Sequence, residues 1–316
     1  MNELKKESSE VKNLVERAIE EVDGFKILCH RFRRNLSVLG RSPKTFENYI
    51  RHLAAIALHF GRSPLELDAE DVQEYLFELQ NRSKTPCQSY FKHTVYSLRF
   101  LLKSEGLPYE HLLLPEIRRE KKLPVVLSKE EMWRMFYSCK YLKHKMLIAI
   151  LYGCGLRCFE VCNVRLSDLD FDRKVLHVVQ GKGKKDRYLP LSEHLIRGLK
   201  GYIEAEKPQI WLFNGKPEIG ANGAFDYRYS QRAVQWAVKE ISKQAGIGKD
   251  IHVHTLRHTY ATHLLEDGLD IITVKDLMGH SRIETTMEYL HVARSNPTRA
   301  FSPLDTLFEQ CAPKKK

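Results

Sequence analysis

Long apolar runs are missing from this 316-residue sequence. A helix that crosses a membrane needs about 20 consecutive apolar residues, and no segment approaches that length. The first residues also lack the apolar stretch of a signal peptide. We therefore expect a cytosolic protein without a membrane partner. The apolar content of 43% is ample for packed cores, and the length suggests about two domains.

A cysteine framework is missing as well. The seven cysteines are odd in number and do not follow the spacing of a disulfide scaffold. Cys154, Cys158 and Cys162 recur every four residues, which predicts one stripe on a helix. A metal site is one interpretation, but no His or Cys pair completes a tetrahedral set. We favour the alternative, a packing face of small residues in a reducing compartment.

The sequence contains neither an internal repeat nor a low-complexity tract. Acidic residues are fewer than basic ones, 40 against 51. The net charge is +11 at pH 7. Residues 1–23 hold seven acidic and four basic side chains, so the positive excess lies in residues 24–316. Such an excess suits a polyanionic partner. Charge alone does not separate a nucleic-acid-binding protein from a soluble basic protein.

Helical periodicity dominates the N-terminal third. Residues 1–22 form a predicted amphipathic helix, and its acidic character favours packing on the body of the protein or on a partner. The apolar positions of this helix are Val11, Val15, Ala18 and Val22. Residues 1–23 are therefore treated as an N-terminal helical extension.

Four further helices are predicted between residues 24 and 106. The first spans about residues 25–39, and Ser42 followed by Pro43 opens the second as N-cap and first helical residue. Asp68 caps the third, and the fourth spans about residues 88–105. This pattern predicts a small helical domain.

Residues 107–127 form a predicted linker with prolines and the basic cluster 118–122. The cluster has two interpretations, a solvated segment or a strap that crosses DNA phosphates. Its place between two domains favours the strap.

A second domain begins with a capping box at Ser128 and extends to residue 300. Residues 145–152 are apolar on nearly all sides, which predicts a core helix that ends at two glycines. Residues 175–180 and 187–191 are predicted strands of a hairpin, and Lys182 lies at its tip.

Three helices are predicted near the C-terminus. The first covers residues 254–267, the second is capped by Asp270, and the third is opened by a capping box at Ser281. In the third helix an apolar stripe is predicted, and Tyr289 lies about 120° away from it. We therefore expect Tyr289 to lie off the packing face. The predicted stripe consists of Ile283, Met287 and Leu290.

Six candidate site residues occur in a characteristic order along the second domain. His254 and Arg257 share a helical face because residues three apart are neighbours. A Gly-His pair and then a tyrosine come after them, and an arginine and a hairpin lysine come before them. The six are Arg157, Lys182, His254, Arg257, His280 and Tyr289. The order and spacing resemble the tyrosine recombinase, or phage integrase, family, and most closely its compact bacterial Xer-type members.

The chemistry of phosphodiester cleavage gives each side chain a candidate role. Two guanidiniums, Arg157 and Arg257, suit the non-bridging oxygens of a phosphorane-like transition state. Tyr289 is the candidate nucleophile, with a phenol pKa of ~10 that we expect nearby cations to lower. Glu160 is expected to fix Arg157 through a contact three residues along the helix.

Proton transfer is assigned to the remaining members of the set. We expect His254 to accept the tyrosine proton or to assist its transfer, and Lys182 to protonate the leaving oxygen. His280 is expected to bond a non-bridging oxygen. His258 is expected to support the motif, and the histidines at 263 and 291 are interpreted as packing or surface residues.

The resemblance implies a fold that is mainly α with a small antiparallel β-sheet. It implies a two-domain DNA clamp, in which a helical, SAM-like core-binding domain (24–106) joins a mixed α/β catalytic domain (128–300). The tail, residues 301–316, would join protomers. Ser302 and Pro303 predict the start of a short helix with one apolar face, and the alternative is that this face docks back on its own chain.

The resemblance also implies an activity. Family members cut and rejoin double-stranded DNA through a 3′-phosphotyrosine and a Holliday junction held by four protomers, and they need no cofactor or metal. The outcome is integration or excision of a mobile element, or resolution of replicon multimers. A DNA-acting enzyme of this kind would be associated with the nucleoid.

Two other functions use related features. A type IB topoisomerase shares the tyrosine chemistry but relaxes DNA without exchanging partners, and a tail that joins protomers argues against it. A non-catalytic DNA-binding regulator would not need the full set of six residues. The larger phage integrases carry an extra N-terminal domain, and integron integrases carry an insertion between Lys182 and His254. We expect neither feature here, so both subfamilies are disfavoured.

Overall fold

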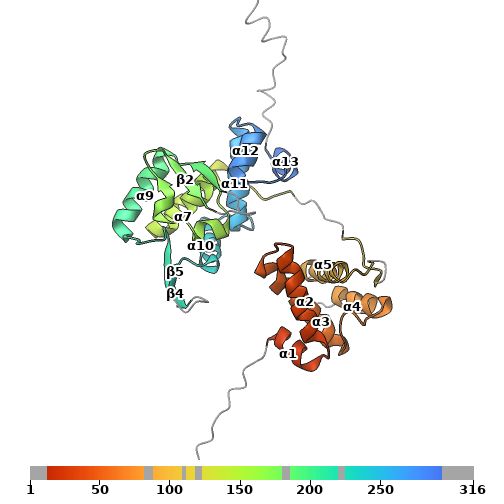
Figure 1. Ribbon diagram of the computed structural model, residues 1–316. Coiled ribbons are helices and arrows are strands. Elements are labelled where there is room, and N and C mark those ends of the chain that lie inside the picture. The colour runs from red at the N-terminus through yellow and green to blue at the C-terminus, as the bar shows by residue number, and fades with distance from the viewer. Residues whose placement is uncertain are drawn as a thin grey trace, which may run out of the picture. The chain divides into compact units, whose positions relative to one another are not determined.

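The computed structural model describes residues 13–81, 88–108, 112–117, 123–179, 186–219 and 225–293. The chain divides into two compact units, Met1–Glu120 and Lys121–Lys316 (Figure 1). Each unit has its own apolar core. The architecture is mostly helical with a small antiparallel sheet, as predicted. Within the described ranges, no helix is long and apolar enough to cross a membrane.

The first unit is helical throughout its described elements. Ser42 caps its third helix with Pro43 as first helical residue, and Asp68 accepts a hydrogen bond from Asp71 N at the start of the fourth, so both predicted starts are confirmed. The bounds are α1 Leu14–Glu21, α2 Phe25–Val38, α3 Pro43–Phe60, α4 Ala69–Asn81 and α5 Gln88–Ser104.

Helix α1 packs against α3. Its Ala18 and the following Val22 are buried in the same core as Phe25 of α2. The expectation that this segment packs on the body of the protein is therefore confirmed for residues 14–21. Residues 1–12 lie outside the described part of the chain.

The second unit combines helices with short strands. Its helices are α6 Lys129–Tyr137, α7 Leu142–Gly153, α8 Cys158–Cys162, α9 Glu193–Glu206, α10 Gln231–Gln244, α11 Val253–Glu266, α12 Ile271–Met278 and α13 Glu284–Leu290, with a 3-10 turn η2 at Leu166–Asp168. Its strands are β1 Leu169–Asp170, β2 Val175–Val178, β3 Arg187–Pro190, β4 Asn214–Ile219 and β5 Phe225–Arg228.

The predicted hairpin forms the main sheet. Strands β1, β2 and β3 are antiparallel in that order, with Leu176 opposite Leu189. Both leucines are fully buried, because alternate residues of a strand point to the same face. The hairpin tip, residues 180–185, lies outside the described residues, and Lys182 lies there.

A second ribbon, formed by β4 and β5, was not expected from the sequence. These strands contain glycine, proline and several charged residues, which are poor strand formers. Gly215 lies so close to the partner strand that an added Cβ would be 2.8 Å from the Arg228 carbonyl oxygen. Close backbone approach therefore explains a glycine that sequence patterns count against a strand.

The cysteine stripe is only partly as predicted. All three cysteines lie in the core of the second unit, which confirms the packing interpretation. They do not lie on one helix, because Cys154 is the C-cap of α7 and Cys158 begins α8. The break follows from Gly155, whose φ of +59° ends the helical path.

Two predictions for α13 are wrong. The helix begins at Glu284 with Ile283 as N-cap, so Ser281 forms no capping box. The predicted apolar stripe is the outer face, since the side chains of Met287 and Leu290 are 45% and 46% exposed. Thr286 and Tyr289 face inward instead, where histidines on α11 and just after α12 form hydrogen bonds with their hydroxyl groups.

Candidate active site

The described site residues come from four separate segments. Arg157 is the N-cap of α8, His254 and Arg257 lie on α11, His280 follows α12, and Tyr289 lies on α13. Helix α13 packs against both α11 and α12 (Figure 1). These elements bring Arg157, Arg257, His280 and Tyr289 together.

The C-terminal end of α12 binds both predicted arginines. Arg157 Nη2 donates to the carbonyl oxygens of Met278 and Gly279, at 3.2 Å each. Arg257 Nη2 donates to the same Met278 oxygen. The last carbonyls of a helix have no partner within the helix and carry partial negative charge, so they attract cations. A shared acceptor atom holds the two guanidiniums side by side.

Glu160 binds Arg157, the first arginine of this pair, and its side chain is only 3% exposed. Its Oε1 accepts from Arg157 Nη1 at 2.7 Å, and its Oε2 accepts from the Arg157 backbone N at 2.8 Å. The expected contact between these residues is therefore present. Burial acts to raise the pKa of the Glu160 carboxyl, but hydrogen bonds from Arg187 and Arg157 lower it to about 2.

Arg187 is a third arginine at this site and was not among the predicted site residues. Its two terminal nitrogens bind both oxygens of Glu160, at 2.9 and 2.8 Å, and its Nε donates to Leu277 O at 3.0 Å. One sequence feature indicated it. Alternate residues of a strand point to the same face, so Arg187 shares the inner face with buried Leu189.

Arg257 is almost completely buried, with 3% exposure. Besides Met278 O, its Nη1 donates to Gly155 O at 2.6 Å. Burial, followed by the charge of Arg157, lowers the pKa of Arg257 to about 10. The side chain therefore remains a cation at neutral pH.

His280 connects Arg257 to α13. Its Nε2 lies 3.3 Å from Arg257 Nη2, and its Nδ1 lies 2.9 Å from Thr286 Oγ1. An arginine only donates, so Nε2 accepts and Nδ1–H donates to the threonine hydroxyl. This arrangement fixes the plane of the imidazole between the arginine and the last helix.

Tyr289 is buried, with 3% exposure, in a small cluster with residues of α11 and α12. Its Oη lies 3.0 Å from Nδ1 of His258. Burial raises the pKa of Tyr289, and the charge of Arg257 only partly opposes the shift. The expectation that nearby cations lower this pKa is wrong, because desolvation of a phenolate outweighs them.

His254 is exposed, and its ring centroid lies 6.3 Å from that of His258. Burial of part of the ring and the charges of Arg257 and Arg157 lower its pKa. Within the described ranges, His258 and not His254 is the hydrogen-bond partner of Tyr289. The sequence favoured His254 because it precedes Arg257 by three residues, and spacing cannot tell which histidine meets a distant helix.

The other histidines named in the sequence analysis have clear places. His263 is buried, with Nδ1 at 2.9 Å from Tyr152 Oη and Nε2 at 2.9 Å from Leu127 O, which confirms a packing role. His291 is exposed. In the part of the chain that the structure describes, no group of three or more His, Cys, Asp or Glu side chains is arranged to hold a metal ion.

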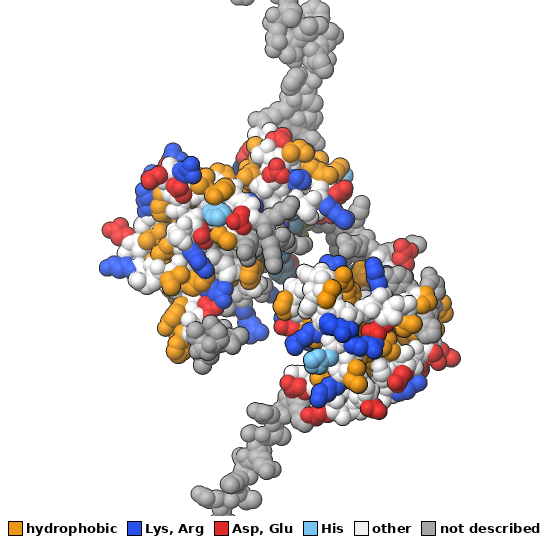
Figure 2. Space-filling view, viewed as in Figure 1, with side chains coloured by type: hydrophobic (Ala, Val, Ile, Leu, Met, Phe, Trp, Pro, Cys, Tyr) orange, Lys and Arg blue, Asp and Glu red, His pale blue; other side chains and the backbone are white. Residues whose placement is uncertain are grey.

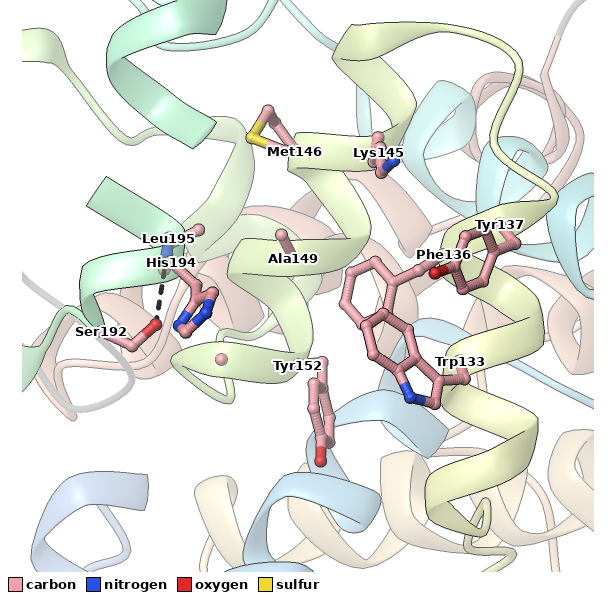
Figure 3. Close-up of a pocket in the computed structure, with 11 residues that line it drawn as sticks. Trp133, Phe136, Tyr137, Lys145, Met146, Ala149, Tyr152, Ser192, His194 and Leu195 are labelled. Atoms are coloured by element: carbon pink, nitrogen blue, oxygen red, sulfur yellow. Dashed lines mark hydrogen bonds between the residues drawn. The ribbon is translucent and has the colours of Figure 1, made fainter. Parts of the chain in front are cut away.

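An apolar groove of about 510 Å³ lies elsewhere in this unit. Figure 3 shows aromatic side chains of α6, among them Trp133 and Phe136, facing Ala149 and Tyr152 of α7, with His194 at its side. None of the described site residues lines it. The groove is therefore separate from the arginine, histidine and tyrosine cluster.

Comparisons with known proteins identify the family of this chain. The phage integrase family model matches residues 125–296, and the phage integrase N-terminal SAM-like domain model matches residues 28–104. A tyrosine recombinase of Thermosipho africanus is 35% identical over 266 residues, which cover 80% of this chain and 90% of that protein.

Tyrosine recombinase XerA of Pyrococcus horikoshii is 31% identical over 274 residues, covering 86% of this chain and 91% of that protein. Among solved structures, a lambda integrase dimer bound to a COC′ core site aligns with a TM-score of 0.66 at 16% identity. That alignment covers 88% of this chain and 97% of the integrase chain, and it shows a similar fold. The chain belongs to the phage integrase family of tyrosine recombinases.

Proposed function

We propose that this protein is a site-specific recombinase that cuts and rejoins double-stranded DNA through a 3′-phosphotyrosine. The observation that carries the proposal is the pair Arg157 and Arg257, held side by side on one carbonyl oxygen, with His280 bonded to the second arginine. Two fixed cations beside a tyrosine suit a phosphodiester under attack.

The arginines bind the non-bridging oxygens of the scissile phosphate. A guanidinium has several N–H donors in a planar fork, so donors remain after the contacts to α12 and Glu160. Glu160 holds Arg157 in place by a direct hydrogen bond, and Arg187 in turn holds Glu160. His280 is assigned to a non-bridging oxygen. To donate there, its Nε2 carries a proton and exchanges its contact with Arg257 Nη2 for the phosphate oxygen.

Tyr289 is the nucleophile. Its Oη forms a bond to phosphorus while the bond from phosphorus to the 5′-oxygen breaks, and Lys182 supplies the proton to that leaving oxygen. His254 assists proton transfer close to the arginine pair. The charge that a metal would bring is supplied by the two arginines, so the proposed mechanism uses neither metal nor cofactor.

The first unit supplies further DNA contacts. Arg33, Arg34, Arg41 and Lys44 are exposed on and between α2 and α3, and Figure 2 shows Lys and Arg side chains gathered over one face of this unit. Such side chains neutralise phosphates without reading sequence. We assign residues 24–106 to DNA binding, residues 107–127 to a linker with a basic strap, and residues 128–300 to catalysis.

The assembly is proposed to be a homotetramer on two synapsed sites, with strand exchange through a Holliday junction. The tail, residues 301–316, lies outside the described residues and is assigned to contacts between protomers. The biological outcome is integration or excision of a mobile element, or resolution of replicon multimers. We place the enzyme in the cytoplasm with the nucleoid, where its DNA substrate lies.

A suicide-substrate assay tests the chemistry. Nicked duplexes tiled across the DNA that flanks the gene are incubated with the protein in EDTA, and SDS-resistant protein–DNA adducts are scored. We expect an adduct with wild-type protein and none with Tyr289→Phe, although both bind the duplex. An adduct formed by the Phe variant, or a wild-type protein that needs Mg²⁺, would overturn the mechanism.

A further inference from the structure

His258 is placed to act directly on the nucleophile. Its Nδ1 lies 3.0 Å from Tyr289 Oη, and the two ring centroids are 5.5 Å apart. His258 follows Arg257 in α11, so one helical turn presents both a cation for the phosphate and an imidazole for the phenol. The steps proposed above give it no part in the reaction.

We propose that His258 is a further catalytic residue, whose Nδ1 takes the phenolic proton as Tyr289 attacks phosphorus. The inference rests on the recombinase function proposed above. In this step the Tyr289 O–H bond breaks, the Oη–P bond forms and the P–O5′ bond breaks, while Lys182 protonates the leaving oxygen. In resealing, Lys182 takes the proton of the attacking DNA 5′-hydroxyl, the O5′–P bond forms, the Oη–P bond breaks, and His258 returns its proton to the departing phenolate.

The electrostatics of the site leave His258 without a proton before the attack. Tyr289 is buried and its pKa is raised, so the phenol is protonated at neutral pH and must lose a proton to form the ester. Burial and the nearby charges of His254 and Arg257 lower the pKa of His258 to about 4. The imidazole is therefore neutral and has a lone pair to offer. A bound phosphate adds negative charge that stabilises the imidazolium once it forms.

The same contact has an alternative interpretation, the positional reading, in which His258 only orients Tyr289. His258 would then hold the Tyr289 ring through a hydrogen bond and take no proton. Asparagine separates the two readings, because its Oδ1 lies about where Nδ1 of histidine lies and accepts a hydrogen bond, but it does not accept a proton at neutral pH.

The experiment measures single-turnover adduct formation by full-length His258→Asn on the nicked duplex that traps wild-type protein. A second duplex carries sulfur in place of the leaving 5′-oxygen, which needs little protonation to depart. His291→Asn is the matched control, since His291 is an exposed histidine two residues beyond Tyr289. DNA affinity is measured for each variant.

A general base contributes about 100-fold or more to rate, so we expect His258→Asn to slow adduct formation by at least about that factor on both duplexes. DNA affinity should stay within about threefold of wild type, because His258 acts on the reacting atoms rather than on binding. Cleavage near the wild-type rate would overturn the proposal in favour of the positional reading. Rescue by the sulfur duplex would also overturn it, because the defect would then lie at the leaving group.

Should the asparagine variant fail to fold, His258→Ala assayed with and without added imidazole decides the question. Acceleration by imidazole supports proton transfer at this position, and a rate that imidazole leaves unchanged overturns it. Tyr289→Phe runs beside these variants. If that variant still forms an adduct, the proposed function fails, and the result is distinct from a failure of the His258 assignment.

Discussion

Replacing Glu160 with glutamine should destabilise the second unit in a pH-dependent way. The side chain is 3% exposed and binds two arginines, and its pKa is lowered from 4.5 to about 2. Each pKa unit corresponds to about 1.4 kcal/mol, so ionised Glu160 contributes about 3 kcal/mol to folding at neutral pH. A glutamine at this position keeps the shape of the protonated acid but leaves Arg157 and Arg187 without their counter-charge.

The sign of the pH dependence follows from the direction of the shift. A depressed carboxyl pKa contributes stability that is fully present above the unfolded value of about 4.5 and is lost as pH falls toward about 2. The difference between wild type and Glu160→Gln should therefore be about 3 kcal/mol near pH 7 and about half of that near pH 3.

Urea unfolding followed by tryptophan fluorescence suits the measurement. All three tryptophans, at positions 133, 211 and 236, lie in the second unit, so the signal reports that unit alone. Glu193→Gln is the control, because Glu193 pairs with Lys174 at the surface and should shift the midpoint far less. A Glu160→Gln loss below about 1 kcal/mol at neutral pH, or one that does not change with pH, would refute the reasoning.

Three further predictions concern other parts of the chain. Gly155→Ala forces a positive φ on alanine and places Cβ 2.3 Å from the Tyr260 ring, so it should cost about 2 kcal/mol or more in the same urea assay. Gly201→Ala, in open space on α9, is its control and should be neutral or stabilising; equal effects would contradict the argument. Lys182→Ala should cleave normal DNA slowly and be largely rescued by sulfur at the leaving position, whereas equal defects on both substrates would exclude it as the general acid. Removing residues 302–316 should spare single-site binding in gel-shift assays and impair synapsis, and wild-type amounts of tetrameric synapse would refute the tail contact.

Much of the local structure followed from the sequence because its causes are local. The Ser42–Pro43 pair and the Ser128 capping box mark helix starts through contacts within one turn, and both formed as predicted. The contact between Arg157 and Glu160 was likewise predicted from a spacing of three residues. The order of the six candidate site residues was sufficient to indicate the family.

Short elements with few apolar residues were harder to predict. Helix α13 has only seven residues, and its apolar pattern favoured a face that is exposed in the structure. The buried face was selected by α11 and α12, which supply His258 for Tyr289 and His280 for Thr286. No pattern within α13 contains that information.

Tertiary structure also decided the chemistry of the site. Arg187 reaches Glu160 from a strand 27 residues away, and the carbonyls at the end of α12 hold three arginines that are distant in sequence. Desolvation raises the pKa of Tyr289 although cations lie nearby, because burial depends on what packs around the ring. The sequence determined which side chains are available and how each helix begins. Only packing between helices decided which of them meet, since that depends on long-range contacts that local spacing does not encode.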